Sequence, residues 1–257
     1  MNPTPPPIDM RRSRLWVLLA AMVGCAITSA LGFWQLDRAA QKQSLERDWL
    51  ARQTLPALDG VAATQLAERE GWDRTLWRTV RLEGHWQEGA TLYLDNRQME
   101  GRPGFYVLTP LRLKNSEQSV LIQRGWVPRR FDDRSALPAV DTPTGPVEVH
   151  GQLAPPPAKL YEFGPEPGGP IRQNVDMPSL EREFRLALWP VSVLQTDKPA
   201  LDAANVLQRA WPRWGAGVEK HHGYAFQWFG LSLLILILYV WFQLIAPRRR
   251  SLSQAGQ

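Results

Sequence analysis

Two adjacent histidines stand at the start of a long apolar run. The segment HHGYAFQWFG covers residues 221–230, and the run continues as LSLLILILYVWFQLIA. Polar groups are costly at the edge of a lipid-buried helix and usually have a function there. His221, Tyr224, Trp228 and Leu231 recur at the spacing of one helix face. The pattern predicts either a ligand-binding imidazole at a membrane surface or an aromatic interfacial belt with an incidental histidine.

Two uncharged runs are long enough to cross a membrane. They cover residues 15–36 and 224–246, and a hydrocarbon core about 30 Å thick needs roughly 20 helical residues. Small residues repeat every four positions at Gly24, Thr28 and Gly32, a spacing that lets a second helix approach closely. The sequence therefore predicts two transmembrane helices, and packing of one against the other is one reading of the small residues. The other is that glycines are simply common in such helices.

Arginines flank the far end of each run, at positions 11, 12, 14 and 248–250. The positive-inside rule then predicts cytoplasmic tails at residues 1–14 and 247–257, and residues 37–223 on the opposite side. No Arg-rich presequence precedes the first run, so we expect a bacterial inner membrane with a periplasmic central domain. Signal cleavage near Ala30 and lipidation at Cys25 are disfavoured, because the apolar run continues through both positions.

The net charge of +5 comes entirely from those tail arginines set against Asp9, since the rest of the chain is balanced. The charge therefore indicates topology and does not predict a nucleic-acid-binding surface. A single cysteine, Cys25, excludes a disulfide framework and a CxxC metal or redox site.

The central domain alternates short strand-like runs with turns. The runs WRTVRLEGHW, TLYLDNR, GFYVLTPLRL, SVLIQRGWVP, VEVHGQL and WPVSVLQT predict mainly antiparallel strands. Residues 154–170 hold six prolines and three glycines and predict a long loop, and Asp176 predicts the N-cap of a helix over PSLEREFRLAL. We expect an α+β membrane protein, in which two transmembrane helices flank a strand-dominated domain.

The first helix should continue beyond the membrane to about Thr54, because no proline interrupts it before Pro56. Arg38 and Lys42 then share a face just outside the membrane, and Trp34 lies one turn below Arg38. Gln35 stands at the same depth. Snorkelling and solvated charge are the simpler explanation of the two cations.

Motifs for catalysis are missing from the sequence, which has no GxSxG, P-loop, GxGxxG or HExxH. His85 and His150 each adjoin a glycine at a strand end, where histidines are usually ordinary turn or edge residues. Arg97, Arg102 and Arg124 stand beside turn glycines and aromatic residues. They could grip carboxylates of a partner bidentately, or they pair within the domain.

Four segments together resemble the Surfeit locus protein 1 family, whose members are assembly factors for haem–copper cytochrome c oxidase. They are LGFWQLDRAAQK, LDNRQMEGRPGFYVLTPL, VLIQRGWVP and HHGYAFQWFGLS, in the family's order and with its two-span layout. The resemblance covers residues 31–246. It departs from the family before His221, where Val218-Glu219-Lys220 replaces residues that are often rich in asparagine.

The resemblance implies a protein that is not an enzyme and helps to mature oxidase subunit I by handling haem a near the outer membrane surface. His221 falls on the family's proposed haem ligand, and His222 does not. Tyr224 and Trp228 would then cover the porphyrin, and Arg38 and Lys42 would meet its propionates. Trp34, Gln35, Arg97, Arg102 and Arg124 are candidates for contact with partners, which would be subunit I and a haem a synthase.

A competing hypothesis is a membrane-anchored scaffold that binds oxidase subunits without haem. A transmembrane sensor is disfavoured, because tails of about 14 and 11 residues leave no room for an output domain. A membrane-anchored hydrolase is disfavoured by the missing nucleophile–base pair.

Overall fold

The computed structural model describes residues 10–129, 137–138, 140–161, 168–197, 207–212, 215 and 217–246. The chain forms two compact units, of which the first combines Met1–Arg47 with Arg213–Gln257 and the second is Asp48–Pro212. The elements are α1 (Met10–Gln53), α2 (Gly60–Glu70), α3 (Trp72–Thr75), β1 (Thr79–Trp86), β2 (Leu92–Met99), β3 (Arg102–Leu113), β4 (Gln118–Pro128), β5 (Val147–Ala154), β6 (Ile171–Arg172), α4 (Met177–Phe184), β7 (Ala187–Gln195), α5 (Val218–Val240) and a π-helical turn η1 (Trp241–Ile245).

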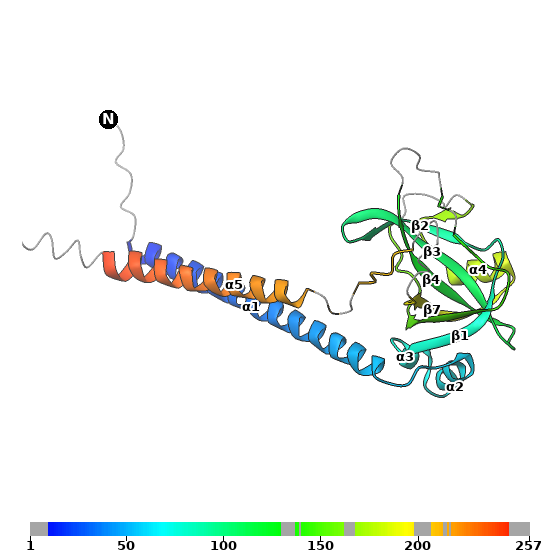
Figure 1. Ribbon diagram of the computed structural model, residues 1–257. Coiled ribbons are helices and arrows are strands. Elements are labelled where there is room, and N and C mark those ends of the chain that lie inside the picture. Colours follow the sequence, from blue (N-terminus) through cyan, green and yellow to red (C-terminus); the bar gives the residue numbers. More distant parts are fainter. Residues whose placement is uncertain are drawn as a thin grey trace, which may run out of the picture. The chain divides into compact units, whose positions relative to one another are not determined.

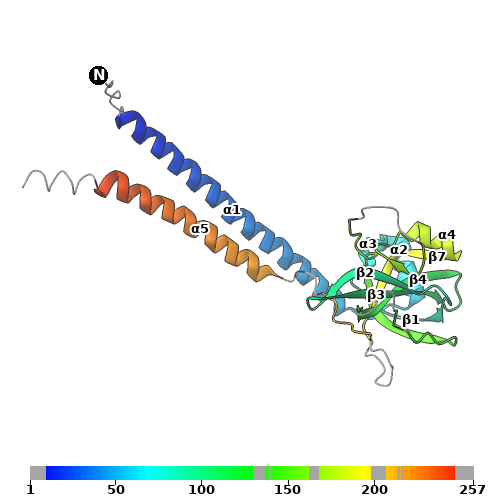
Figure 2. The same ribbon diagram turned by 90° about the horizontal axis from the view of Figure 1, so that it is seen from above.

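The first unit is built on α1 and α5, which run side by side in Figures 1 and 2. α1 extends without interruption to Gln53, which confirms the helical extension predicted as far as Thr54. α5 begins at Val218, six residues before the start predicted for the second span, so His221 lies within its first turns. Both helices are long and apolar enough to cross a membrane.

Exposed apolar side chains are concentrated on these two helices. Among the described residues, all the large exposed hydrophobic side chains lie on α1, α5 or η1 except Leu55, Val61 and Tyr161. Phe226 is 80% exposed and Phe33 is 66% exposed. An apolar surface of this extent is unfavourable in water and needs lipid or another protein to cover it.

The second unit is a β-barrel with an added hairpin edge. Five strands follow the order β1-β5-β7-β4-β3, and β1 also pairs with β3, which closes the ring. β1 changes partner at Gly84, which pairs with both Val147 and Leu113. A Cβ at Gly84 would lie 2.1 Å from the carbonyl oxygen of Arg112, so only glycine allows this corner.

The predicted strands are all present, and most pairings are antiparallel as expected. Two are parallel: β4 with β7, and β2 with the short β6, which the sequence did not predict. Figure 1 shows α4 beside the barrel, in the connection that returns the chain from β5 to β7. The parallel strands β4 and β7 are joined by the long stretch of chain that contains β5, β6 and α4, since a parallel pair requires a crossover connection.

The helix predicted after Asp176 is correct at its start and wrong at its end. The Asp176 side chain accepts a hydrogen bond from the backbone N–H of Ser179 at 3.2 Å, as an N-cap does. The helix stops at Phe184, because Arg185 adopts φ 55°, ψ 49° and caps it through a bond to Glu181. Leu188, predicted on the helix, belongs to β7 instead.

A helix that the sequence analysis did not predict covers the barrel beside β1. α2 starts after Asp59, whose side chain accepts from the N–H of Ala62 at 2.8 Å. Its alanines Ala63 and Ala67 are buried, and Ala63 belongs to the main core of the barrel. Branched aliphatic side chains and tryptophans fill that core, and Ile122 and Trp189 are fully buried examples.

Candidate functional site

α1 and α5 face each other along two stripes of buried or half-buried residues. On each helix the stripe positions alternate at intervals of three and four, the pattern of left-handed helix packing. The stripe of α1 comprises Cys25, Thr28, Gly32, Gln35, Ala39 and Lys42, and that of α5 comprises Val218, His221, Ala225, Trp228, Ser232 and Ile235. We call these residues the helix-pair interface.

The centre of the helix-pair interface combines close apolar packing with polar contacts. A Cβ at Gly32 would lie 2.7 Å from the Phe229 ring, so the glycine is needed for the observed approach. Ser29 and Ser232 are joined by their hydroxyls at 3.1 Å, and Cys25 Sγ lies 3.6 Å from the Ser232 carbonyl oxygen. The reading of the small residues as a packing surface is therefore confirmed for Gly24 and Gly32, which face Ile235 and Phe229.

The outer end of the interface brings two predicted site residues together. His221 Nδ1 and Gln35 Oε1 are 2.7 Å apart, one from each helix. Both side chains are half-buried, whereas His222 is exposed. Adjacent residues differ by about 100° around a helix, so only one of the two histidines can face α1.

The aromatic stripe predicted around His221 is divided by this packing. Trp228 is half-buried in the interface, while Tyr224 is 51% exposed and Leu231 is 46% exposed. One side of the stripe, at Trp228, therefore lies in the helix-pair interface, and the other side, at Tyr224 and Leu231, is exposed. Trp34 on α1 is also 53% exposed, which leaves its indole free to meet lipid or a partner.

The two predicted cations differ in their surroundings. Arg38 is exposed and donates from Nη1 to Gln41 Oε1 at 3.0 Å, and Gln41 in turn donates to Asp37 at 2.8 Å. Lys42 is half-buried beside the start of α5, where a Cβ at Gly217 would lie 3.7 Å from its ammonium nitrogen. Neither contact tests a role in binding propionates, so that role stays a prediction.

Arg97 and Arg124 are buried inside the sheet-rich unit, each 7% exposed. Arg97 donates to the carbonyl oxygens of Ala158 and Gln173 at 2.8 and 2.9 Å. Arg124 donates to the Asp141 carbonyl oxygen at 2.5 Å and the Thr142 hydroxyl at 2.9 Å. Both arginines therefore hold loop backbone in place, and carboxylates of the domain are not their direct hydrogen-bond partners among the described residues.

Burial also affects the charge of Arg124. Desolvation, together with the nearby Arg209, lowers the pKa of Arg124 from its ordinary value to about 10. The guanidinium lies 4.4 Å above the Trp86 ring, a cation–π contact that offsets part of the cost of burial.

Arg102 is the exposed member of the three candidate arginines. Its Nη2 donates to Gln208 Oε1 at 3.0 Å and lies 3.8 Å from Glu100, with the side chain 55% exposed. It also lies over the Trp126 ring at 5.4 Å. Of the three arginines, Arg102 alone has its side chain at the surface, where a partner could reach it.

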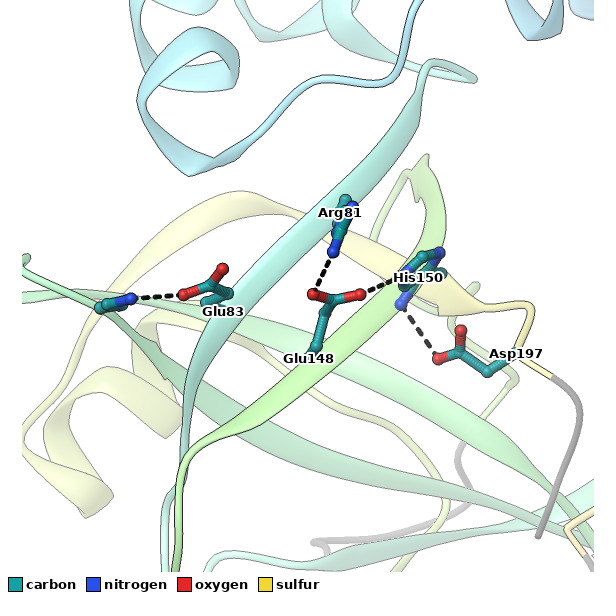
Figure 3. Close-up of polar contacts among 6 residues, drawn as sticks. Arg81, Glu83, Glu148, His150 and Asp197 are labelled. Atoms are coloured by element: carbon teal, nitrogen blue, oxygen red, sulfur yellow. Dashed lines mark hydrogen bonds and ion pairs between the residues drawn. The ribbon is translucent and has the colours of Figure 1, made fainter.

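His85 and His150 lie within β1 and β5 and not in turns, and both side chains are exposed. Figure 3 shows a row of charged side chains on β1 and β5, in which Glu148 joins Arg81 at 2.6 Å and also contacts the His150 ring. Glu83 pairs with Lys114 at 2.6 Å in the same region. These groups are exposed and mutually paired, and His85 is likewise exposed on β1.

A surface cleft of about 870 Å³, which was not predicted from the sequence, lies between α2 and the β3–β4 turn. Its lining includes Thr64, Glu68 and the Glu83–Lys114 pair. The lining charges have both signs, and α2 itself was not predicted, so no sequence signal pointed to this cleft.

The profile of the SURF1 family matches residues 22–233. The chain belongs to the SURF1 family. A SURF1-like protein of Rickettsia felis is 25% identical over 229 residues, covering 86% of this chain and 94% of that protein. Surfeit locus protein 1 of Arabidopsis thaliana is 31% identical over 141 residues, or 49% of this chain and 38% of that protein. Cytochrome oxidase assembly protein SHY1 of Saccharomyces cerevisiae is 28% identical over 123 residues, or 46% and 31%.

The SURF1 match includes both sides of the His221–Gln35 contact and the three candidate arginines. It confirms the resemblance drawn from the four segments. Among the described residues, no group of three or more His, Cys, Asp or Glu side chains gathers to hold a bare metal ion. A haem would need far less from the protein, because a single imidazole can ligate its iron.

The donor set at His221 fits that requirement. With Nδ1 engaged by Gln35, the second ring nitrogen, Nε2, remains for a ligand. Metal-bound histidines almost always use their other nitrogen in such a hydrogen bond. His221 would hold a haem iron through this nitrogen, and Tyr224 and Trp228 lie about one and two turns further along the helix.

Proposed function

We propose that this SURF1-family chain is an assembly factor for haem–copper cytochrome c oxidase and that it handles haem a for insertion into subunit I. Family membership supports the assembly role, and the yeast relative carries the name of a cytochrome oxidase assembly protein. The His221–Gln35 contact is the observation that carries the haem role. No residue is given a catalytic role.

The proposed setting is a bacterial inner membrane. Two helices of sufficient length and apolarity support a membrane location, and the flanking arginines support cytoplasmic ends for both. The sheet-rich domain then lies in the periplasm, and His221 lies at the outer membrane surface. The Rickettsia relatives show that the family occurs in bacteria.

The roles of the site residues follow from their positions. His221 would ligate the iron through Nε2, and Trp228 would pack against one edge of the ring system. Tyr224, Arg38 and Lys42 would lie where a haem extends beyond the helix pair, so the two cations are candidates for its propionates. Haem a, when bound, supplies the iron centre for the axial ligand. Subunit I and a haem a synthase are the proposed partners.

The test of the haem role uses the full chain, purified in detergent from a host that makes haem a. We expect a Soret band in the wild type and its loss or shift in His221→Ala. The adjacent His222→Ala is the matched control, because that ring is exposed, and it should keep the band. An unchanged spectrum in His221→Ala would remove His221 as the ligand.

The alternative function is a scaffold that holds oxidase subunits without haem. The exposed position of Arg102 favours a role in partner binding, as does the 53% exposure of Trp34. This function predicts capture of subunit I by wild-type protein that contains no pigment. It also predicts weaker capture by Arg102→Ala with unchanged folding.

A further inference from the structure

The contact between Gln35 and His221 is held in place by the packing around it. Ala39 above Gln35 is 1% exposed, and Ala225, one turn below His221, is 2% exposed. Gly32, one turn below Gln35, lies against the Phe229 ring. Because small buried residues bracket the contact on both helices, the two backbones are fixed at a short distance. The 2.7 Å separation of Oε1 and Nδ1 is therefore a consequence of helix packing.

The chemistry of the two groups assigns the proton. A carbonyl oxygen can only accept a hydrogen bond, so a partner at Gln35 Oε1 must donate. A neutral imidazole carries one N–H and one lone pair. If Nδ1 donates to Gln35, the lone pair is on Nε2, which is the form that ligates a metal.

We propose that Gln35 is a positioning residue that holds His221 as the Nδ1-protonated tautomer and aims its Nε2 lone pair at the haem iron. The part that concerns iron rests on the proposed function, whereas the tautomer does not. Gln35 thereby acts on the ligand through His221 and need not touch haem itself.

The inference assigns different consequences to three side chains at position 35. Leucine is similar in size to glutamine but removes the acceptor, so the imidazole loses its orientation and the preference for Nδ1–H. Glutamate supplies a stronger, charged acceptor and gives the imidazole more imidazolate character. A more basic imidazole stabilises ferric iron, so the midpoint potential should rise in the order Glu, Gln, Leu.

The first experiment needs no haem. The full chain carries four histidines, so ¹⁵N-histidine labelling in lipid nanodiscs gives four imidazole signals. His221→Ala assigns the signal of interest. We expect Nδ1–H in the wild type and a shift towards Nε2–H in Gln35→Leu. The matched control is Gln43→Leu, because Gln43 lies on the same helix with its side chain exposed.

The second experiment uses pigment-containing protein. Loss of a hydrogen-bond partner of a metal-ligating histidine typically weakens metal binding about 10–100-fold. We expect a loss of haem affinity of this size in Gln35→Leu. The midpoint potential should follow the order given above, with Gln43→Leu equal to the wild type. Circular dichroism of each variant checks that the fold is retained.

The outcomes separate the two proposals. A wild type with the Nε2–H tautomer, or a Gln35→Leu signal like that of the wild type, overturns the positioning role whether or not haem binds. Unchanged haem affinity and potential in Gln35→Leu, with pigment lost in His221→Ala, also overturns it and leaves the proposed function intact. A wild type without pigment overturns the haem function, while the tautomer result still decides the role of Gln35.

Discussion

Truncation of Arg124 should destabilise the sheet-rich unit far more than truncation of Arg102. Arg124→Ala removes the hydrogen bonds to Asp141 and Thr142 and the contact with the Trp86 ring. Arg102→Ala removes one hydrogen bond to Gln208, a surface ion pair at 3.8 Å and the contact with the Trp126 ring at 5.4 Å. Both residues follow the same arginine–glycine–aromatic pattern in the sequence, so the comparison isolates the effect of burial.

The size of the Arg124 effect follows from its contacts. A hydrogen bond from a charged donor contributes about 1.5–3 kcal/mol, and a desolvated cation–π contact contributes about 2 kcal/mol. Burial next to Arg209, which lowers the pKa of Arg124 to about 10, offsets part of this sum. We expect the free energy of unfolding to fall by about 2–4 kcal/mol in Arg124→Ala. For Arg102→Ala the expected change is about 0–1 kcal/mol.

The assay is urea unfolding of the full chain in detergent, followed by near-ultraviolet circular dichroism. The fully buried Trp126 and Trp189 belong to the sheet-rich unit, so their signal reports its packing. Arg124→Lys should unfold as easily as Arg124→Ala, because a lysine keeps a buried charge without the two-pronged geometry. Equal midpoints for Arg124→Ala and Arg102→Ala would refute the view that burial gives Arg124 its role.

Two further perturbations test the helix pair and the charged row of Figure 3. Gly32→Ala places a Cβ 2.7 Å from the Phe229 ring, so the helices must separate at a cost of about 1–3 kcal/mol. Oxidative cross-linking of Cys25 to Ser232→Cys should then slow, while Gly230→Ala, with nothing within 4 Å, should leave it unchanged. The pKa of Glu148 is lowered below 4.5, mainly by the hydrogen bond from Arg81 and to a smaller extent by the one from His150. Its stabilising contribution is therefore present above that value and is lost as the pH falls through the folded pKa. The difference in urea midpoint between wild type and Glu148→Gln should shrink on acidification, and a constant difference would contradict this account.

The strands were predictable because alternation of apolar and polar residues is a local signal. Their partners were not, since the parallel pairing of β4 with β7 joins residues about 70 positions apart. α2 escaped prediction because its buried face consists of Ala63 and Ala67, which carry little hydrophobic periodicity. The end of α4 depends on the left-handed backbone at Arg185, a residue type that gives no such signal.

The positions of the candidate residues along the two helices were predictable, but their rotation about the helix axes was not. Charge flanks and span length placed His221 level with Gln35, Arg38 and Lys42. Whether any of these face one another depends on how the two helices pack, which is set jointly by stripes on both. The signal was present in the three–four spacing of Cys25, Thr28, Gly32, Gln35 and Ala39, and it becomes informative only when paired with the matching stripe of α5.

The burial of the three candidate arginines could not be predicted from the sequence. Arg97, Arg102 and Arg124 all stand near turn glycines and aromatic residues in the sequence. In the structure Arg97 and Arg124 are buried, whereas Arg102 is exposed. Exposure depends on loops that approach from distant segments, such as Ala158 and Gln173 over Arg97. For Arg97 and Arg124 a role in partner binding stays a prediction, and mutation of either confounds binding with stability.

The pair of histidines at the start of α5 can now be understood through the neighbouring helix. A polar side chain at the lipid boundary is tolerated when a partner satisfies it, and Gln35 does so for one nitrogen of His221. This single hydrogen bond leaves the second ring nitrogen available for another partner. An apolar residue, or a histidine with both nitrogens bonded, would have no such nitrogen. His222, about 100° around the helix, points away from α1 and is exposed. The difference between the two histidines therefore arises from their orientation toward α1, so substitutions on α1 are the sharpest probes of the role of His221.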